Sequence, residues 1–463
     1  MLLFICSYNE ANGFLRWKDM GSYLIKPELD GIYPTVSHGK GSYVYDLEGN
    51  KYLDGASGAV TCNIGHGTED IIQALKEQLD SVSFVYRSQF TSAPAEELAL
   101  FLADHLPGGL NWSFFVNSGS EAVETAMKMA VQYWQEKGQY QKSVFLSRWG
   151  SYHGITLGAL SLSGFYERRY RFTQLLERFP AVSAPNMYRS ELQGEEFVKA
   201  AAEELETAVK RIGASFIAGF VAEPIVGAAG AAITPPAGYY EALKDVCRRH
   251  RILFIADEVM TGLGRTGRML ASEHWGIVPD IAVLGKGLGA GYAPIAAAVA
   301  SDDIIETIKR GSGAIMSGHT YSANPYCARA ALEVLRYVKK HGLLQQAEEK
   351  GAILRRKLEQ IKERSGVIGD VRGKGLLIGV EFVKDKTTKE VFPKKQAFTE
   401  KMITEAKKRG LLIYPAKPGI DSGEGDAVII APPLTASHAE LDELSDLFSL
   451  AAEEAAEKMM KRD

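Results

Sequence analysis

The residues best suited to chemistry are an aspartate and a lysine that each follow a short apolar run. Asp257 follows the run Leu253–Ala256, and Lys286 comes 29 positions after Asp257, between Gly285 and Gly287. Open α/β sheets place their ligand crevice at the carboxyl ends of their strands, and glycines let another group approach the backbone closely. A lysine there suits Schiff-base chemistry. The alternative is an aspartate that caps a turn and a lysine on the surface.

A second candidate site is the turn Ser118-Gly119-Ser120, which separates an apolar run ending at Val116 from a pattern of helical period. Free N–H groups and the positive end of the helix dipole would make this turn a phosphate site. The alternative is a capping box in which Ser118 and Glu121 satisfy only each other's backbone.

Three further side chains follow predicted strands. Tyr152 and His153 stand in the sequence Trp149-Gly-Ser-Tyr-His-Gly154, and Glu223 comes directly after Phe216–Ala222, in the position that Asp257 has on its own strand. The Tyr152 ring could stack on a planar heteroaromatic group. A tyrosine–histidine pair could equally be packing.

The segment Gly262-Leu-Gly-Arg-Thr-Gly267 matches the dinucleotide fingerprint G-x-G-x-x-G. The residues after it, Arg268 to Gly276, carry no helical stripe, and no acidic strand end follows at the required distance. A dinucleotide-dependent oxidoreductase is therefore a remote alternative.

The elements that must position these residues alternate between strands and helices from about Glu69 to Val338, the pattern of a mainly parallel sheet covered on both faces. The predicted strands are Trp112–Val116, Ser143–Leu146, Phe216–Ala222, Ile252–Ala256, Ile281–Leu284 and Ile295–Ala300. The predicted helices are Glu69–Leu79, Pro94–His105, Glu121–Glu136, Glu195–Ile212, Gly238–His250 and Asn324–Lys340.

The two ends of the chain differ from this pattern. The N-terminal segment contains a hairpin with a Glu48-Gly49-Asn50 turn. The C-terminal segment contains charged helices, a strand at Leu376–Phe382 and a helix from about His438. We expect an N-terminal segment (1–66), a large α/β domain (67–338) and a C-terminal segment (339–463), with the two ends combined into a smaller α+β domain. Residues Met1–Asp19, ahead of Met20, are expected to be a poorly ordered extension or a misassigned start.

Composition narrows the class of function. The net charge of −4 provides no global positive field for nucleic acid or an anionic membrane. The four cysteines form no C-x-x-C pair, which argues against a metal cage and disulfides and favours a cytoplasmic setting. No apolar run is long enough to cross a membrane. Small-molecule chemistry is the better expectation.

Together these motifs resemble the class III aminotransferases, which include ornithine, 4-aminobutyrate and other ω-amino acid transaminases. The resemblance runs from about Ser42 to Leu434. The motifs that carry it are Asn117-Ser-Gly-Ser-Glu-Ala122, Tyr152-His-Gly154, Asp257-Glu-Val259, Thr261–Gly267, Lys286-Gly287, His319-Thr-Tyr321 and Ala431-Pro-Pro-Leu434. It implies fold type I of the pyridoxal-5′-phosphate (PLP) enzymes and a homodimer with active sites at the interface.

The resemblance also implies a role for each site residue. Lys286 would form the internal aldimine, and Asp257 would face the pyridine nitrogen of PLP. Tyr152 and Val259 would enclose the ring, and Thr320 would reach the phosphate of the neighbouring subunit's cofactor. The other expected cofactor contacts are Ser118, Gly119, Ser120, His153 and Glu223.

The implied reaction is a ping-pong transfer of an amino group from an amine or ω-amino acid to a keto acid, with Lys286 as proton carrier. An aminomutase, epimerase or lyase on the same scaffold stays open, since Lys286 and Asp257 would serve those reactions equally well.

Two positions depart from the family pattern. Met260 stands where many members have glutamine, and Ile429 stands where others have an arginine that binds a carboxylate. Without that arginine we expect Glu223 to lack a cationic partner and to favour cationic or neutral donors. Arg87 and Lys417 are the candidates for binding the acceptor's carboxylate.

Overall fold

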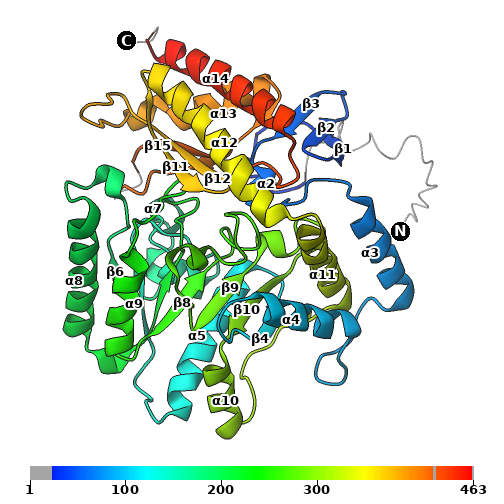
Figure 1. Cartoon of the computed structure of the whole chain (residues 1–463), viewed down its shortest axis with the longest axis vertical. Coiled ribbons are helices and arrows are strands. Elements are labelled where there is room, and N and C mark those ends of the chain that lie inside the picture. The colour runs from blue at the N-terminus through cyan, green and yellow to red at the C-terminus, as the bar shows by residue number, and fades with distance from the viewer. Residues whose placement is uncertain (1–22, 421–423, 461–463) are drawn as a thin grey trace, which may run out of the picture.

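The computed structural model of the protein describes residues 23–420 and 424–460. They form a large α/β part and, above it in Figure 1, a smaller part built from both ends of the chain. The expected extension Met1–Asp19 lies outside the described residues. In the described ranges, no helix is both long enough and apolar enough to span a bilayer.

The large part is centred on a seven-stranded sheet of order β4-β10-β9-β8-β7-β5-β6. Its strands are β4 (Trp112–Val116), β5 (Val144–Arg148), β6 (Ala181–Val182), β7 (Ile217–Ala222), β8 (Leu253–Asp257), β9 (Ile281–Leu284) and β10 (Ala296–Ala300). The pairings from β6 to β9 are parallel, and β10 is antiparallel to both β9 and β4. The prediction of a mainly parallel sheet is confirmed.

The single reversed strand decides where the site lies. Because β10 runs opposite to both of its neighbours, β4 and β9 run in the same direction. The carboxyl ends of β4, β5, β7, β8 and β9 therefore share one edge of the sheet. This is the edge at which an open α/β sheet binds its ligand.

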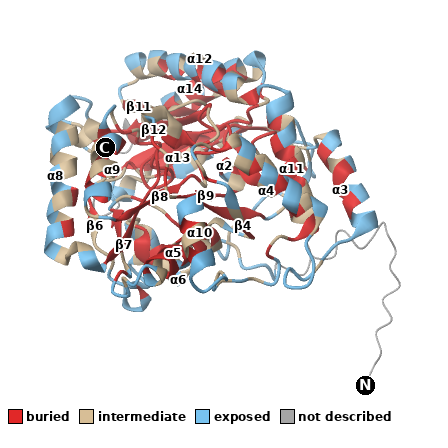
Figure 2. Cartoon of the chain, turned by 60° about the horizontal axis from the view of Figure 1, so that its bottom comes forward, coloured by how far each residue is buried: buried red, intermediate tan, exposed pale blue. Residues whose placement is uncertain are grey.

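Helices cover both faces of the sheet because its strands are apolar on both sides (Figure 2). In β8, Leu253 and Ile255 pack with α5 (Gly119–Glu136), whereas Phe254 and Ala256 pack with α9 (Tyr239–Arg249). The other helices of this part are α3 (Glu69–Ser81), α4 (Ala93–His105), α6 (Leu157–Leu162), α7 (Tyr166–Arg169), α8 (Gly194–Ile212), α10 (Asp302–Arg310) and α11 (Pro325–Lys340). Each predicted strand and helix of this part forms within two residues of its expected bounds.

The smaller part contains two four-stranded sheets. One has the order β1 (Val36–Lys40), β2 (Tyr43–Asp46), β3 (Lys51–Asp54), β13 (Leu411–Leu412), and the other β11 (Ile368–Lys374), β12 (Leu377–Phe382), β15 (Asp426–Ile430), β14 (Tyr414–Ala416). The predicted hairpin is β2–β3, and its turn is closed by the Asp46 carboxylate, which accepts from the N–H groups of Glu48 and Asn50. The helices of the smaller part are α2 (Ser57–Val60), α12 (Leu343–Arg364), α13 (Phe398–Lys408) and α14 (His438–Met460).

The two ends of the chain are joined directly, because β13 pairs in parallel with β3. One apolar cluster contains Leu53 from the first segment and Leu411 and Phe448 from the last. These contacts support the expected combination of the two ends. The domain limits at residues 66/67 and 338/339 stay a prediction.

Candidate active site

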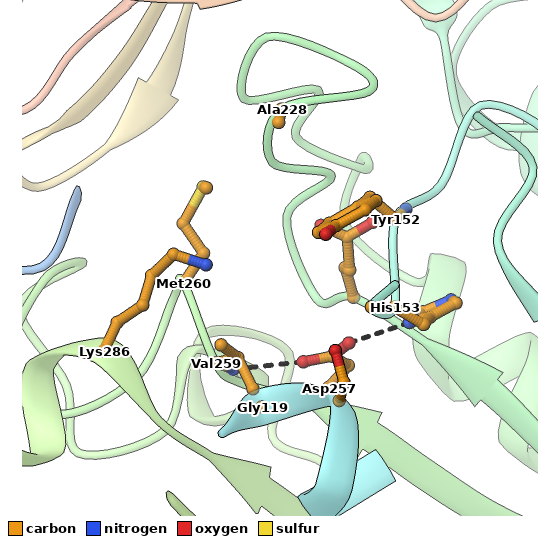
Figure 3. Close-up of a pocket in the computed structure, with 11 residues that line it drawn as sticks. Gly119, Tyr152, His153, Ala228, Asp257, Val259, Met260 and Lys286 are labelled. Carbon is orange, nitrogen blue, oxygen red and sulfur yellow. Dashed lines mark hydrogen bonds and ion pairs between the residues drawn. The ribbon is translucent and has the colours of Figure 1, made fainter. Parts of the chain in front are cut away.

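Eight of the predicted site residues line one cavity of about 210 Å³. They are Gly119, Ser120, Tyr152, His153, Glu223, Asp257, Val259 and Lys286. Figure 3 shows the side chains of Lys286, Tyr152 and Asp257 turned toward the same space. Residues far apart in the sequence meet here because each follows the carboxyl end of a strand at the shared edge.

Asp257 is buried, and both of its carboxylate oxygens have partners. Oδ2 lies 2.8 Å from Nδ1 of His153, and Oδ1 accepts from the N–H of Val259 at 3.1 Å. Because a carboxylate only accepts, Nδ1 of His153 carries the hydrogen. His153 Nε2 is buried and has no partner among the described residues. These bonds orient the carboxylate, and each oxygen keeps a second lone pair that can accept a further hydrogen bond.

Lys286 is the first residue of a 3₁₀ turn, Lys286–Leu288, directly after β9. Its backbone φ is +41°, an uncommon conformation for a residue with a side chain, and such backbone strain concentrates at functional sites. Burial lowers the pKa of the Lys286 amine, against the opposite effect of Asp257 and Glu223. The neutral, nucleophilic form of the amine is therefore favoured relative to an exposed lysine.

The amino end of α5 forms the floor of the cavity. Ser118 and Glu121 form the complete capping box, in which the Ser118 Oγ accepts from Glu121 N–H and the Glu121 carboxylate accepts from Ser118 N–H. This pairing leaves the N–H groups of Gly119 and Ser120 without acceptors in the described part of the chain. The Ser120 Oγ accepts from Ile155 N–H at 3.0 Å, so its own hydrogen is free to be donated.

Val259 lies between the helix end and the lysine turn. A methyl group built on Gly119 would stand 3.1 Å from Val259 Cγ1, and one built on Gly285 would stand 3.2 Å from the same atom. The two glycines therefore let the valine side chain rest directly on the backbone. Its branched surface forms one apolar wall of the cavity.

Glu223 and Tyr152 are connected through the backbone. The Glu223 carboxylate accepts from the N–H of Tyr152 at 2.9 Å and from the N–H of Gly227 at 2.8 Å. Burial raises the pKa of Glu223, and no guanidinium pairs with its carboxylate among the described residues. The Tyr152 ring packs edge-on against Phe165 with 6.2 Å between the ring centres, which limits how the phenol can turn.

The other four predicted site residues lie outside the cavity lining. Ser118 is used as the helix cap, and Thr320 is exposed. Arg87 donates to the carbonyl of Ser317 at 2.6 Å. Lys417 pairs with Glu167 at 3.5 Å. Within one subunit, neither Arg87 nor Lys417 reaches the cavity, and their roles stay predictions.

Three lining residues were not predicted as site residues: Gly154, Ala228 and Met260. Met260 could have been found, because it comes directly after the Asp257-Glu258-Val259 motif. Ala228 gives no sequence signal, since it lies in an irregular loop after β7. It belongs to an apolar cluster with Met260 and the fully buried Ile429. Ile429 itself is not a lining residue; it packs in the apolar cluster to which the lining residues Ala228 and Met260 also belong.

Comparisons with known proteins match nearly the whole chain. The family model described as "Aminotransferase class-III" matches residues 25–452. The Bacillus subtilis aminotransferase YodT is 72% identical over 96% of this chain and 100% of its own length. The putrescine–pyruvate aminotransferase of Pseudomonas aeruginosa is 36% identical over 89% of each protein.

Solved structures give the same result. An (S)-enantioselective ω-transaminase from Thermomicrobium roseum superposes with a TM-score of 0.90 at 37% identity, over 96% of this chain and 99% of that one. The ω-transaminase of Pseudomonas jessenii in complex with PMP gives 0.89 at 33% identity, over 95% and 98%. The expected fold type I is thus confirmed. This chain belongs to the class III aminotransferase family and is an aminotransferase.

Proposed function

We propose that the protein uses PLP, held by Lys286, to transfer amino groups by a ping-pong mechanism. The observation that supports this most directly is the buried amine of Lys286 in one cavity with the Asp257–His153 pair. The P. jessenii relative, whose solved structure contains PMP, supports the same cofactor.

The lining residues fit PLP group by group. The unpaired N–H groups of Gly119 and Ser120, at the positive end of α5, suit a phosphate. The Val259 side chain and the Tyr152 ring offer two surfaces for a flat ring. The buried Asp257 carboxylate suits the protonated nitrogen of a pyridine. Lys286 provides the amine that such an aldehyde requires.

When bound, PLP supplies an electron sink for the carbon next to the transferred amine. Asp257 would supply the negative charge that favours a protonated ring nitrogen, and His153 and Val259 keep its carboxylate oriented. Lys286 Nζ, as a neutral amine in this cavity, would take up a proton from the substrate carbon and return it, a general acid–base role. Burial of Lys286 supports this role because it lowers the cost of the neutral form.

For the donor, we propose diamines and other ω-amines rather than short α-amino acids. Among the described residues no cation forms an ion pair with the Glu223 carboxylate, which lines the cavity. The cluster of Ala228, Met260 and Ile429 beside it is apolar and offers no charge to bind a donor carboxylate. The name of the P. aeruginosa relative, a putrescine–pyruvate aminotransferase, is consistent with a diamine donor and a keto acid acceptor.

A donor profile tests this specificity. We expect diamines to exceed alanine and glutamate in the wild type, and Glu223→Gln to reduce the preference, because the neutral amide removes the attraction for a second ammonium group. Gln keeps the size of the side chain, so it serves as the conservative variant. An unchanged ranking in Glu223→Gln, or α-amino acids that exceed every diamine, would show that Glu223 does not select the donor.

Reduction with borohydride tests the cofactor and its lysine. The wild type should absorb in the visible range with PLP, lose this band on reduction and carry the added mass on the peptide that contains Lys286. Lys286→Ala should show neither signal and should lose transaminase turnover by several orders of magnitude. Label on another lysine contradicts the assignment, and an isomerised amine without keto product indicates a mutase instead.

A further inference from the structure

The glycine-rich segment Gly262–Gly267 forms a tight hairpin instead of a phosphate loop. The N–H of Leu263 donates to the carbonyl of Met269 at 2.7 Å, and that of Gly264 donates to the carbonyl of Arg268 at 2.9 Å. A short 3₁₀ turn, Ala271–Trp275, follows in place of a long helix. The hairpin begins shortly after Asp257 and presents Arg265 near its tip.

Arg265 is fully buried, and its guanidinium donates four hydrogen bonds, two to the N-terminal segment and two to the C-terminal segment. Nη2 bonds to the Ser57 Oγ at 3.1 Å and the Asn63 Oδ1 at 2.7 Å, and Nη1 bonds to the carbonyls of Leu376 at 3.1 Å and Pro432 at 2.6 Å. No carboxylate pairs with Arg265 within the described ranges. Burying a cation costs free energy, and these four acceptors offset part of that cost. Their arrangement suits the planar, forked donors of a guanidinium better than the single ammonium of a lysine.

Asn63 carries the effect of Arg265 to the active site. A methyl group built on Gly287 would stand 2.2 Å from Asn63 Nδ2, so the amide lies directly against the backbone next to Lys286. The carbonyl of Asn63 also accepts from the N–H of Leu434 at 2.7 Å. Asn63 is thus held from two sides while it contacts the turn in which Lys286 has its strained φ of +41°.

The base of the hairpin is held as firmly as its tip. The buried Glu258 carboxylate, next to Asp257, accepts from the N–H groups of Ala271 at 2.9 Å and Ser272 at 2.8 Å. The hydroxyl of Thr261 also donates to this carboxylate. A rigid hairpin can fix the position of Arg265 relative to Asp257, since both are attached to the end of β8.

We propose that Arg265 is a positioning residue that fixes the Lys286 turn through Asn63 and Gly287 and holds both chain ends against the active site. It does not touch the reacting atoms. The proposal rests on the proposed function only in that Lys286 is the cofactor lysine. A strained conformation persists when the surrounding contacts over-determine it, and Asn63 is one such contact.

Four variants test the proposal: Arg265→Lys, which keeps the charge and loses the fork, Arg265→Met, Asn63→Ala and the control Lys142→Met. Lys142 is also a buried cation that donates only to carbonyls, those of Ala214, Ile217 and Arg251, at the opposite edge of the sheet. Its loss should lower the melting temperature without changing the active site.

Hydrogen exchange of the cofactor-free protein is the first measurement. Arg265→Lys and Asn63→Ala should both speed exchange in residues 57–65 and 285–291, whereas Lys142→Met should not. In the PLP-bound enzymes we expect kcat to fall on the order of 10- to 100-fold in both variants, with a smaller change in KM, because misplacement of a reacting group has effects of this size. The double variant Arg265→Lys/Asn63→Ala should be no worse than the poorer single one, since the two residues act in series.

Several results would overturn the proposal. One is a hydrogen-exchange rate in residues 285–291 of the Arg265 variants that equals the wild-type rate. Another is a double variant whose loss of kcat equals the two single losses combined. If Arg265→Met does not fold, Arg265→Lys and Asn63→Ala still decide the matter. Borohydride labelling of the wild type distinguishes failure of the proposed function from failure of the role of Arg265. Absence of label on Lys286 rejects the proposed function. Label on Lys286 together with unchanged hydrogen exchange in the variants rejects only the role of Arg265.

Discussion

At the scale of single residues, the active site depends on how a few charges are buried. Asp257 and Glu223 both lie in the cavity wall, yet Asp257 is paired with the imidazole of His153, whereas Glu223 is held by backbone N–H groups alone. Burial raises the pKa of Glu223 and lowers that of Lys286. Environment, rather than residue type, thus separates the roles we propose for the two carboxylates.

Replacement of Asp257 by asparagine keeps the shape of the side chain and removes its charge. We expect the half-reaction with a good donor to slow on the order of 10² to 10³-fold, the usual effect of removing one electrostatic group from an active site. His153→Ala should cost less, because the Asp257 charge remains. Single-turnover absorbance measurements give both rates, and a larger loss in His153→Ala than in Asp257→Asn would contradict the assignment.

The buried lysine should make the cofactor-free protein less stable. Because the folded pKa of Lys286 lies below that of an exposed lysine, the folded state binds fewer protons, and stability rises with pH up to the unfolded value of 10.5. Lys286→Met removes the cost of burying this charge. We therefore expect it to raise the melting temperature at pH 7 by a few degrees, with a difference that shrinks toward pH 10. A difference that grows with pH would show that the amine is not buried at a cost.

At the scale of elements, the start of α5 combines a structural cap with a proposed phosphate site. The capping box uses the hydroxyl of Ser118, whereas Ser120 and its N–H face the cavity. The two alternatives that the sequence left open for this turn are therefore compatible, because different donors of the same helical turn serve each.

Two serine variants separate these roles. Ser118→Ala should cost about 1 kcal/mol of stability, the usual value of an N-cap, with little change in PLP affinity. Ser120→Ala should weaken PLP binding and leave the melting temperature of the cofactor-free protein nearly unchanged. Denaturant unfolding and a PLP titration followed by absorbance measure the two effects. Equal losses of affinity in both variants would contradict the division.

At the scale of the whole molecule, we propose that the site is shared between two copies of the chain. Thr320 is exposed and outside the cavity, and its neighbour His319 lies 3.8 Å from Glu121 at the start of α5. Arg87 contacts the same loop through Ser317. We propose that this surface meets a second copy of the chain, so that Thr320 reaches the phosphate of the neighbouring cofactor.

Hybrid dimers test the shared site. Lys286→Ala and Thr320→Ala subunits, unfolded and refolded together, should form hybrids with one site that carries both changes and one that carries neither. Random pairing of equal amounts should then restore activity to about a quarter of the wild type at limiting PLP. Each variant refolded alone is the control. Sedimentation as a monomer, or no gain on mixing, would contradict the shared site.

The sequence by itself determined the long strands and helices of the large part and most of the residues at the cavity. Strand β8 could be predicted because Leu253–Ala256 form one apolar run of four residues, and Asp257 could be placed at its end. The capping box and the lysine between glycines are likewise short-range patterns. Such patterns are readable because helix caps and strand periodicity depend on neighbours in the chain.

Only the tertiary structure decided which distant groups meet. The contact of His153 with Asp257 spans 104 positions, and the contact of Arg265 with Asn63 spans 202. The sequence likewise did not indicate the partners of Arg87 and Lys417, which contact the Ser317 carbonyl and Glu167 outside the cavity. Contacts between residues this far apart depend on how the sheets and helices pack. The type of a single charged residue does not indicate which distant segment will pack against it.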